Sequence, residues 1–289
     1  MKQAPLPTSH VGSLKRTLSH WPQWVILLIV TAAALIFVIP LWWTIVWGSW
    51  HTDTIFSFPP RFLPGPYMLD NLKKLEAQIS VWRAFLNSVI VTGVSLAGAL
   101  FFCSLAGFAF AKYRFRFKNA LFYILLATMA VPGQITAIPL FVIMLKLGWV
   151  NTYQGIIIPG LVPAFGVFLM RTSIQQAIPD EILESARMDG ANEVRIFFQI
   201  AFPNLLPYIA ALSVFLFAGS WGSLYWPIIM LRSSDMFTLP VSLASIIGSY
   251  SQPYDELMVG SLLSVIPPLL LLLFLQRFFV KSLVAASFR

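Results

Sequence analysis

The chain carries very little charge. Only 10% of its residues are Asp, Glu, Lys or Arg, 58% are hydrophobic, and the mean hydropathy is +0.80. Soluble domains average about 25% charged residues, so this composition is too apolar to cover a globular surface. The deficit excludes an ordinary soluble enzyme and indicates an integral membrane protein.

Cysteine and histidine are nearly absent. The single cysteine, Cys103, has no partner for an internal disulfide, and the three histidines, His10, His20 and His51, lie far apart in the sequence. These residue types are the usual ligands of structural zinc, so we expect no metal site. The sequence also lacks GxxxxGKS, GxxxxGKT, HExxH and GxSxG motifs. We therefore expect no cofactor in this chain, no catalytic residue and no ATPase site of its own.

Acidic residues are absent from the interiors of the apolar runs. All eleven lie in polar segments or at the ends of apolar runs. Ion-coupled transporters usually keep a carboxylate near the membrane midplane, where it binds the driving ion. If this chain moves a solute uphill, the energy is therefore expected to come from elsewhere. An ion-coupled secondary transporter is the alternative hypothesis, and a membrane-embedded enzyme or scaffold is another that no catalytic cluster supports.

Six apolar runs predict an all-α integral membrane protein with six transmembrane helices over residues 24–280. The first run, residues 24–47, has no charge and reaches about 36 Å at about 1.5 Å per residue, enough to cross a hydrocarbon core of about 30 Å. A polar tail of residues 1–23 precedes it and no cleavage site follows, so we expect a retained anchor. The other runs fall at about 85–111, 119–145, 154–170, 205–230 and 257–279. The fourth contains Gly155, Pro159, Gly160 and Pro163 and is also compatible with a re-entrant segment.

Lysine and arginine are unevenly distributed among the loops. The short loop KYRFRFK at 112–118 is the most basic segment. The positive-inside rule then places both termini, residues 1–23 and 281–289, in the cytoplasm. Contact with anionic lipid at the inner leaflet accounts for the net charge of +8, so no nucleic acid is expected as a partner.

A polar insert interrupts the apolar pattern between the fourth and fifth spans, at residues 172–204. Pro179 is suited to a first helical position, and acidic residues follow it in the first turns. Gly190 falls where a left-handed cap ends a helix, and Asn192 can cap a second helix that begins with Glu193. The pattern predicts two short helices hinged at Gly190. Its amphipathicity alone is equally compatible with an interfacial helix on the membrane.

The spacing within this insert resembles the EAA signature, E-A-A-x3-G-x9-I-x-L-P, of membrane subunits of binding-protein-dependent ABC importers. Five anchor positions match, and two depart, Ser185 for Ala and Phe202 for Leu. The matching residues are Glu184, Ala186, Gly190, Ile200 and Pro203. The longer string ARMDGANEVRIFFQIAFPNLLP is similar to the sugar-importer branch, and further likenesses extend over residues 20–289, most closely to the maltose-type second permease subunit.

This resemblance implies a function and a set of partners. The insert would be a cytoplasmic coupling helix that docks on an ATPase, and the residues expected to couple are Glu184, Ser185, Ala186, Arg187, Asp189 and Gly190. The assembly would comprise this chain and a second permease subunit in a heterodimer, two ATPase subunits that bind ATP and Mg²⁺, and an external solute-binding protein. The solute would be a small molecule, a sugar or polyol, crossing the bacterial inner membrane.

A few polar and aromatic groups at span depth are candidates for the solute pathway. Gln134 and Thr136 lie in the segment VPGQITAIP, whose prolines loosen a helix, and Trp221 and Tyr225 are spaced one turn apart. Interfacial aromatic belts and bonds between helices are the alternative roles, and the second permease subunit is an alternative holder of the solute. In the external loop, residues 48–84, we expect a helix over 68–82 that contacts lipid or the binding protein. Small residues four apart predict close helix contacts at Gly93/Ala97, Gly107/Ala111 and Ala218/Gly222.

Overall fold

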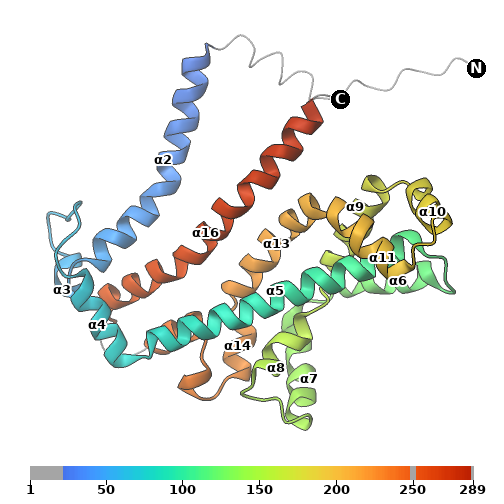
Figure 1. The fold of residues 1–289 in the computed structure, drawn as a ribbon. Helices are drawn as coiled ribbons and strands as arrows, with labels where there is room; N and C mark the ends of the chain where they lie inside the picture. The colour runs from blue at the N-terminus through green and yellow to red at the C-terminus, as the bar shows by residue number, and fades with distance from the viewer. Residues whose placement is uncertain (1–21, 248–251, 288–289) are drawn as a thin grey trace, which may run out of the picture.

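The computed structural model describes residues 22–247 and 252–287, with side chains as far as Gln276. The predicted cytoplasmic tails, most of 1–23 and the side chains of 281–289, lie outside these residues. Every regular element within the described part is helical. The helices form an elongated molecule in which α5 (Val81–Lys112) runs along most of the length (Figure 1).

Four stretches in the described residues are long and apolar enough to cross a membrane. They are α2 (Gln23–Gly48), α5, the stretch of α13 (Leu206–Trp221) with α14 (Tyr225–Met230), and the described start of α16 (Tyr254–Ser287). Two bent helix pairs qualify as well if each is counted as one span, so length and composition give four to six spans. The predicted ranges 24–47, 85–111, 205–230 and 257–279 each fall on one of the four stretches.

The predicted third span is not a single helix. It consists of α6 (Lys118–Thr128) and α7 (Gly133–Lys146), which meet at 103°. Pro132, in an extended conformation, separates them, because a proline disfavours helical geometry at the residue before it. The fourth range bends by only 42°, between α8 (Tyr153–Ile157) with η1 (Ile158–Gly160) and α9 (Ala164–Ala177), so the stronger break lies in the third span.

Helix α9 packs closely along α5. A methyl group at Gly107 would lie 2.7 Å from the Cβ of Met170, and one at Gly166 would lie 2.6 Å from the Sγ of Cys103. The close contact predicted at Gly107 is thus confirmed, and Cys103 is a buried packing residue. At Gly93, by contrast, an added methyl group would meet no atom of another element within 4 Å. The surface of α5 at Gly93 is therefore open within the described chain.

At the external end, the predicted helix over 68–82 is α4 (Met68–Gln78). Its Leu75 is fully buried, and Asn71 donates hydrogen bonds to the carbonyl oxygens of Gly48 (2.9 Å) and Trp50 (3.0 Å). Part of the apolar side of α4 therefore packs inside the protein, against α16 and the start of α5, while Leu69 remains exposed. A short helix, α3 (Thr52–Ile55), precedes it, and its Thr52 donates to the buried carboxylate of Asp255 at 2.5 Å.

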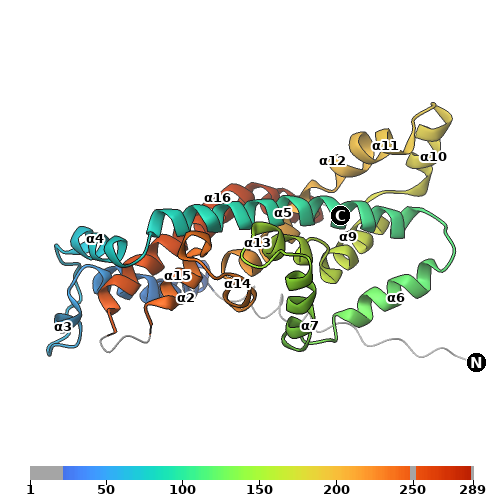
Figure 2. The ribbon, with the colours of Figure 1, turned by 90° about the horizontal axis from the view of Figure 1, so that it is seen from below.

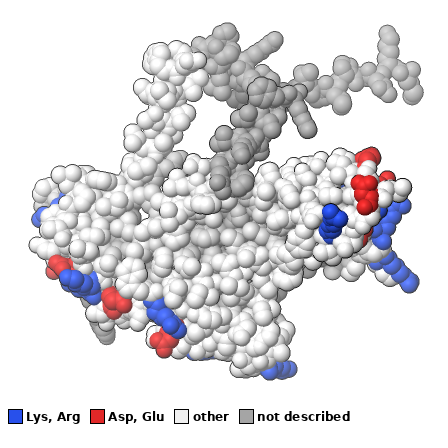
Figure 3. All heavy atoms as spheres, viewed as in Figure 1, with Lys and Arg blue, Asp and Glu red and all other residues white. Residues whose placement is uncertain are grey.

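The two ends of the molecule are distinct. The segment containing α10 (Asp180–Met188) stands at one end, and α3 and α4 lie at the other (Figure 2). Charged side chains lie at the end that carries α10 and along the left and lower edges of the view, and the middle of the viewed face is uncharged (Figure 3). This is the distribution expected of a protein whose apolar middle lies in lipid.

Candidate functional site

The polar insert forms a bent helical segment. Helix α10 ends at a Schellman motif, in which the amide of Gly190 donates to the carbonyl oxygen of Arg187 and that of Ala191 to Ala186, both at 3.0 Å. Gly190 has φ +79°, a left-handed conformation that glycine adopts without strain. The side chain of Asn192 then accepts a hydrogen bond from the amide of Arg195 at 2.8 Å and starts the next helix. The predicted bend and both caps are confirmed.

Two details differ from the prediction. Pro179 is the N-cap of α10, and Asp180 is the first helical residue. The second helix is longer than the predicted short helix, because α11 (Glu193–Arg195) continues into the π-helical turn η2 (Ile196–Ala201) and α12 (Phe202–Asn204). The wider turn of η2 directly precedes Phe202 and Pro203, and proline has no amide hydrogen to donate to the preceding turn.

An apolar cluster fixes the bent segment to the membrane helices. Ile178 and Leu183 are buried with Ile196 and Phe197, and these pack against Phe108 near the end of α5. The Phe108 and Phe197 rings are 5.5 Å apart, edge to face. The buried side of α10 therefore faces the protein, and the interpretation of this helix as a purely interfacial one is not needed.

Polar contacts join the same segment to the loop after α5. Lys112 donates to the carbonyl oxygen of Ile178 at 2.5 Å and to Asp180 at 2.6 Å. The hydroxyl of Tyr113 donates to Oε2 of Glu193 at 2.6 Å, and Nε of Arg187 donates to Oε1 of the same carboxylate at 2.8 Å. Sequence reasoning assigned the loop KYRFRFK only to orientation and missed these contacts. The sequence offered one signal for these contacts. Basic and aromatic residues alternate in this loop, and acidic residues begin the helix after Pro179.

These contacts shift the pKa values of the groups that make them. The hydrogen bond from Arg187 lowers the pKa of Glu193 below its ordinary range, and that from Tyr113 adds to the effect. The hydrogen bond from Lys112 lowers the pKa of Asp180. Burial, followed by the hydrogen bond to Glu193, raises the pKa of Tyr113 to about 12. At neutral pH the two carboxylates are ionised and the phenol is a hydrogen-bond donor.

The six residues expected to couple divide into two groups. Ala186, Arg187 and Gly190 shape or hold the bend, while Ser185 donates to the Glu181 carbonyl oxygen at 2.8 Å. Glu184 and Asp189 are exposed, and their carboxylates form no hydrogen bond or ion pair with another described residue. Their charges are available to a molecule outside this chain.

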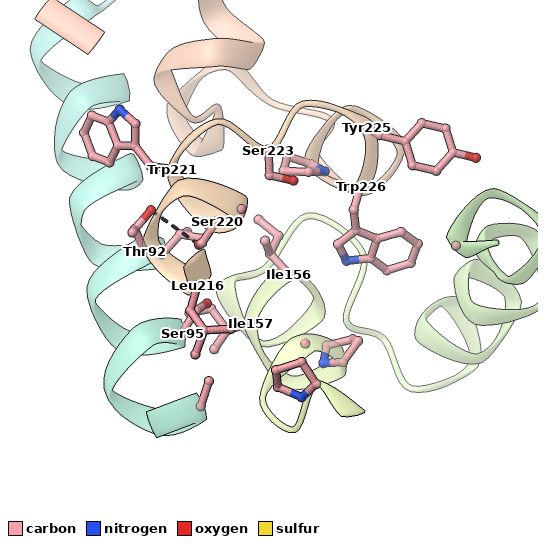
Figure 4. A pocket seen from close by; sticks show the side chains of 18 of the residues that line it. Thr92, Ser95, Ile156, Ile157, Leu216, Ser220, Trp221, Ser223, Tyr225 and Trp226 are labelled. Carbon is pink, nitrogen blue, oxygen red and sulfur yellow. Dashed lines mark hydrogen bonds between the residues drawn. The ribbon is translucent and has the colours of Figure 1, made fainter. Parts of the chain in front are cut away.

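The four candidate pathway residues line one cavity of about 500 Å³. Gln134 and Thr136 come from α7, Trp221 from the end of α13 and Tyr225 from the start of α14. Residues that sequence reasoning did not select complete the wall, and Figure 4 shows several of them, among them Thr92, Ser95, Ser220 and Ser223. Thr92 and Ser95, three residues apart on α5, share a helix face, a signal that the sequence offered.

Trp221 and Tyr225 do not form the shared aromatic face that their spacing predicts. Helix α13 ends at Trp221, and α14 begins at Tyr225 after a break, so the two rings point away from each other (Figure 4). The indole of Trp221 donates to the Ser264 carbonyl oxygen at 2.8 Å and stacks on Phe217 at 5.7 Å, so this residue joins α13 to α16. Tyr225 is more exposed, and its hydroxyl lies 3.5 Å from the Gln134 carbonyl oxygen.

The cavity is uncharged, and most of its wall is apolar. Hydroxyl, amide and indole groups line it, and none of the described lining residues is Asp, Glu, Lys, Arg or His. In the described part of the chain, no group of three or more His, Cys, Asp or Glu side chains is placed to hold a metal ion.

The sequence between residues 103 and 284 matches a family described as binding-protein-dependent transport system inner membrane component. The chain belongs to this family. It is therefore a multi-pass membrane permease of a binding-protein-dependent import system, a transport component rather than an enzyme. This membership decides against the ion-coupled secondary transporter and against the membrane-embedded enzyme.

Three similar proteins are likewise permease proteins of transport systems. The arabinooligosaccharides transport system permease protein AraQ of Halalkalibacterium halodurans is 37% identical over 77% of this chain and 80% of its own. The lactose transport system permease protein LacG of Rhizobium radiobacter is 32% identical over 95% and 98%. The sn-glycerol-3-phosphate transport system permease protein UgpE of Escherichia coli K12 is 29% identical over 89% and 94%.

A solved structure shares the fold. The crystal structure of a bacterial ABC transporter involved in the import of the acidic polysaccharide alginate contains a chain with a TM-score of 0.77 and 22% identity, aligned over 96% of this chain and 100% of that chain. At this identity the likeness establishes the fold alone.

Proposed function

We propose that this permease translocates an uncharged sugar or polyol and is driven by a separate ATPase that docks on the bent segment of residues 172–204. The observation that carries the proposal is the construction of that segment. A rigid bend at Gly190 presents one side of α10 to the outside while its other side is fixed to the membrane helices. A segment fixed in this way can transmit a displacement from a bound partner to the membrane helices.

The outward side of α10 has the chemistry of a docking surface. Met188 is 88% exposed, and Ile182 and Val194 are also exposed apolar side chains beside the unpaired carboxylates of Glu184 and Asp189. Apolar anchors ringed by charged groups are typical of protein interfaces. This side lies at the end of the molecule opposite α3 and α4 (Figure 2), which supports a cytoplasmic ATPase, with ATP and Mg²⁺, as the occupant.

Six spans with both termini in the cytoplasm accommodate this arrangement. Counting each bent pair as one span gives six, an even number that returns the chain to the side on which it began. Lys112, Arg114 and Arg116 then lie in the cytoplasm beside α10, as the positive-inside rule requires. The external end, with α3 and α4, would face the solute-binding protein.

A second permease subunit accounts for the surfaces that this chain leaves open. Helix α2 diverges from α16 toward its N-terminus (Figure 1), and its Phe37 is 81% exposed, whereas Val46 at its other end is fully buried. A methyl group added at Gly93 on α5 would likewise meet no atom within 4 Å. Small and apolar groups of this kind permit close helix packing in a membrane. In the assembly, a second permease subunit, two ATPase subunits and the binding protein would join this chain.

The cavity supports an uncharged polyhydroxylated solute. Hydroxyl groups from Thr92, Ser95 and Thr136 can exchange hydrogen bonds with sugar hydroxyls, and Tyr225 and Trp226 offer aromatic faces. Burying an unpaired phosphate or carboxylate against such a wall would cost several kcal/mol. AraQ and LacG are named for arabinooligosaccharides and lactose, which are neutral, whereas UgpE is named for the anionic sn-glycerol 3-phosphate, so the neutral class rests on the uncharged cavity wall.

Affinity purification tests the assembly. A tagged copy of the chain is expressed in its native cells, solubilised in mild detergent, and the retained proteins are identified by mass spectrometry. We expect an ATPase and a second permease. Proteoliposomes that contain this chain alone should show no uptake driven by a sodium or proton gradient, and such uptake would contradict the proposal. Binding of neutral sugars, but not of sn-glycerol 3-phosphate, by the cognate binding protein tests the solute class.

A further inference from the structure

The cytoplasmic end of α5 holds the bent segment on both sides of its hinge. Lys112 binds the start of α10, through the Ile178 carbonyl oxygen just before the helix and through Asp180, its first residue, and Tyr113 binds Glu193 after Gly190. Arg187 closes the set by pairing with the same Glu193 carboxylate. We call Lys112, Tyr113, Asp180, Arg187 and Glu193 the α5 clasp.

Two side chains of the α5 clasp, Lys112 and Tyr113, rest on buried parts of the protein. The side chain of Lys112 is only 6% exposed, so its ammonium group is held between its two acceptors and has little access to water. The ring of Tyr113 packs edge to face on Phe108 at 5.6 Å, and Phe108 in turn packs on Phe197. A displacement of the bent segment would have to carry the end of α5 with it or break these contacts.

The other half of α5 forms a wall of the cavity. Thr92 and Ser95 line it, twenty and seventeen positions before Lys112 on the same helix. Helix α5 contains no proline and has no break over its 32 residues, which at about 1.5 Å per residue span about 48 Å. An uninterrupted helix can transmit a displacement from one end to the other as a rigid rod.

The other paths between the bent segment and the cavity run through α12 and α13 and through two bent helix pairs. The chain continues from α12 through Leu205, which has helical φ and ψ, into α13, whose Phe215 and Ser220 also line the cavity. The α6 and α7 helices meet at 103°, and the path through α9 bends by 42° before it reaches α8. Among the described helices, α5 and α13 both reach the cavity without a sharp bend, and α5 is the one whose end binds the bent segment on both sides of Gly190.

We propose that Lys112 and Tyr113 are positioning residues that make α5 the lever between the docked ATPase and the solute cavity. This inference rests on the proposed function, because it presupposes that an ATPase moves the bent segment. The two side chains touch neither solute nor nucleotide. Their role is to make the cavity wall follow the hinge, which requires Lys112 to stay with Asp180 and Tyr113 to stay with Glu193.

The single cysteine of the chain provides a readout that needs no knowledge of the solute. In a Cys103→Ala background, Ser95→Cys places one thiol on the cavity wall of α5. Its rate of reaction with a charged methanethiosulfonate reagent is measured in the purified complex, without nucleotide and with Mg-ATP and vanadate. We expect a nucleotide-dependent change in this rate if the ATPase moves α5.

The clasp is then weakened by Tyr113→Phe, which removes only the hydroxyl, and by Lys112→Gln. We expect the nucleotide-dependent change at position 95 to fall about three- to tenfold, the range that follows from losing a charge-assisted hydrogen bond at a partly exposed site. The ATPase should still co-purify. Tyr123→Phe is the matched control, because that side chain is 69% exposed, and it should leave the change intact.

A charge exchange separates positioning from simple loss of structure. Lys112→Glu alone should abolish the response, and Lys112→Glu with Asp180→Lys should restore part of it, because opposite charges face each other again. A full response in Tyr113→Phe and Lys112→Gln would overturn the α5 lever. Absence of the ATPase from the unmodified complex would instead overturn the proposed function, so the two failures are distinguishable.

Discussion

Arg187 and Glu193 face each other across Gly190, with Nε of Arg187 2.8 Å from Oε1 of Glu193 and a second contact of 3.4 Å to Oε2. The pair closes the hinge on the side opposite the buried cluster. Both side chains are partly exposed, so the pair contributes at most about 1 kcal/mol to stability. Its effect is geometric, because a paired guanidinium and carboxylate hold one angle between α10 and α11.

The first prediction concerns Gly190. Its φ of +79° suits glycine, so Gly190→Leu should either strain the turn by about 1 kcal/mol or more or straighten it. A Cβ atom added there would meet no atom of the chain within 4 Å, so the expected strain comes from the backbone conformation. We expect the variant to insert in the membrane but to lose the ATPase on purification and to lose transport.

Gly190→Asn is the matched control for that change. Asparagine tolerates the left-handed conformation better than other side chains, so it should retain most ATPase binding. If Gly190→Leu keeps the ATPase and transports at the wild-type rate, the bend is not required for docking.

The second prediction concerns Glu184. Its carboxylate forms no hydrogen bond or ion pair within the described chain, so reversing its charge should leave the fold intact. We expect Glu184→Lys to reduce ATPase co-purification at least about tenfold if a basic group of the ATPase lies opposite, as for a desolvated charge pair at an interface. Glu184→Gln should have a smaller effect. Equal retention by wild type and Glu184→Lys would show that this side of α10 is not the docking surface.

The third prediction concerns pH. Asp180 and Glu193 have lowered pKa values, so their contacts stabilise the fold above the ordinary values of 3.8 and 4.5 and are lost as the pH falls through the lowered values. ATPase retention should therefore be flat from pH 8 to pH 5. Measured on the immobilised complex, a midpoint between pH 5 and pH 7 would contradict this assignment. Tyr113, with a pKa of about 12, should remain a donor throughout that range.

Much of the fold could be predicted from the sequence because membrane spans and helix caps are local properties. The apolar run of α2, the left-handed Gly190 and the cap at Asn192 each depend on a few neighbouring residues. The 103° angle between α6 and α7 could not be predicted in the same way. Pro132 marks a break, but its angle is set by the helices that pack around it.

The sites were predictable to different degrees. The docking segment is recognisable by spacing within one stretch of sequence. The cavity is assembled from α5, α7, α8, α13 and α14, so Thr92 and Ser95 could be joined to Gln134 only once the packing was known. The pairing of Tyr113 with Glu193, eighty residues apart, is likewise a product of tertiary structure.

The fourth prediction separates Trp221 from Tyr225. The buried indole of Trp221 bonds Ser264 across to α16, so Trp221→Phe should lower thermal stability by about 1 kcal/mol or more. Tyr225→Phe removes only a hydroxyl at the long distance of 3.5 Å and should leave stability unchanged. Tyr225→Ala should reduce transport without releasing the ATPase. Thermal unfolding in detergent and uptake in cells measure the two effects, and an equal loss of stability in both phenylalanine variants would contradict the distinction.

The last prediction compares two glycines of α5. A methyl group at Gly107 would lie 2.7 Å from the Cβ of Met170 and 2.8 Å from the amide nitrogen of Arg171, so Gly107→Ala must push α9 away from α5. We expect it to destabilise the isolated chain by about 1–3 kcal/mol. Gly93→Ala meets no atom within 4 Å and should leave the isolated chain unchanged or slightly more stable. In the purified complex, a bulkier Gly93→Leu should weaken association if a second permease subunit packs there. Detergent melting curves and subunit retention distinguish these cases, and destabilisation of the isolated chain by Gly93→Ala would contradict the open surface.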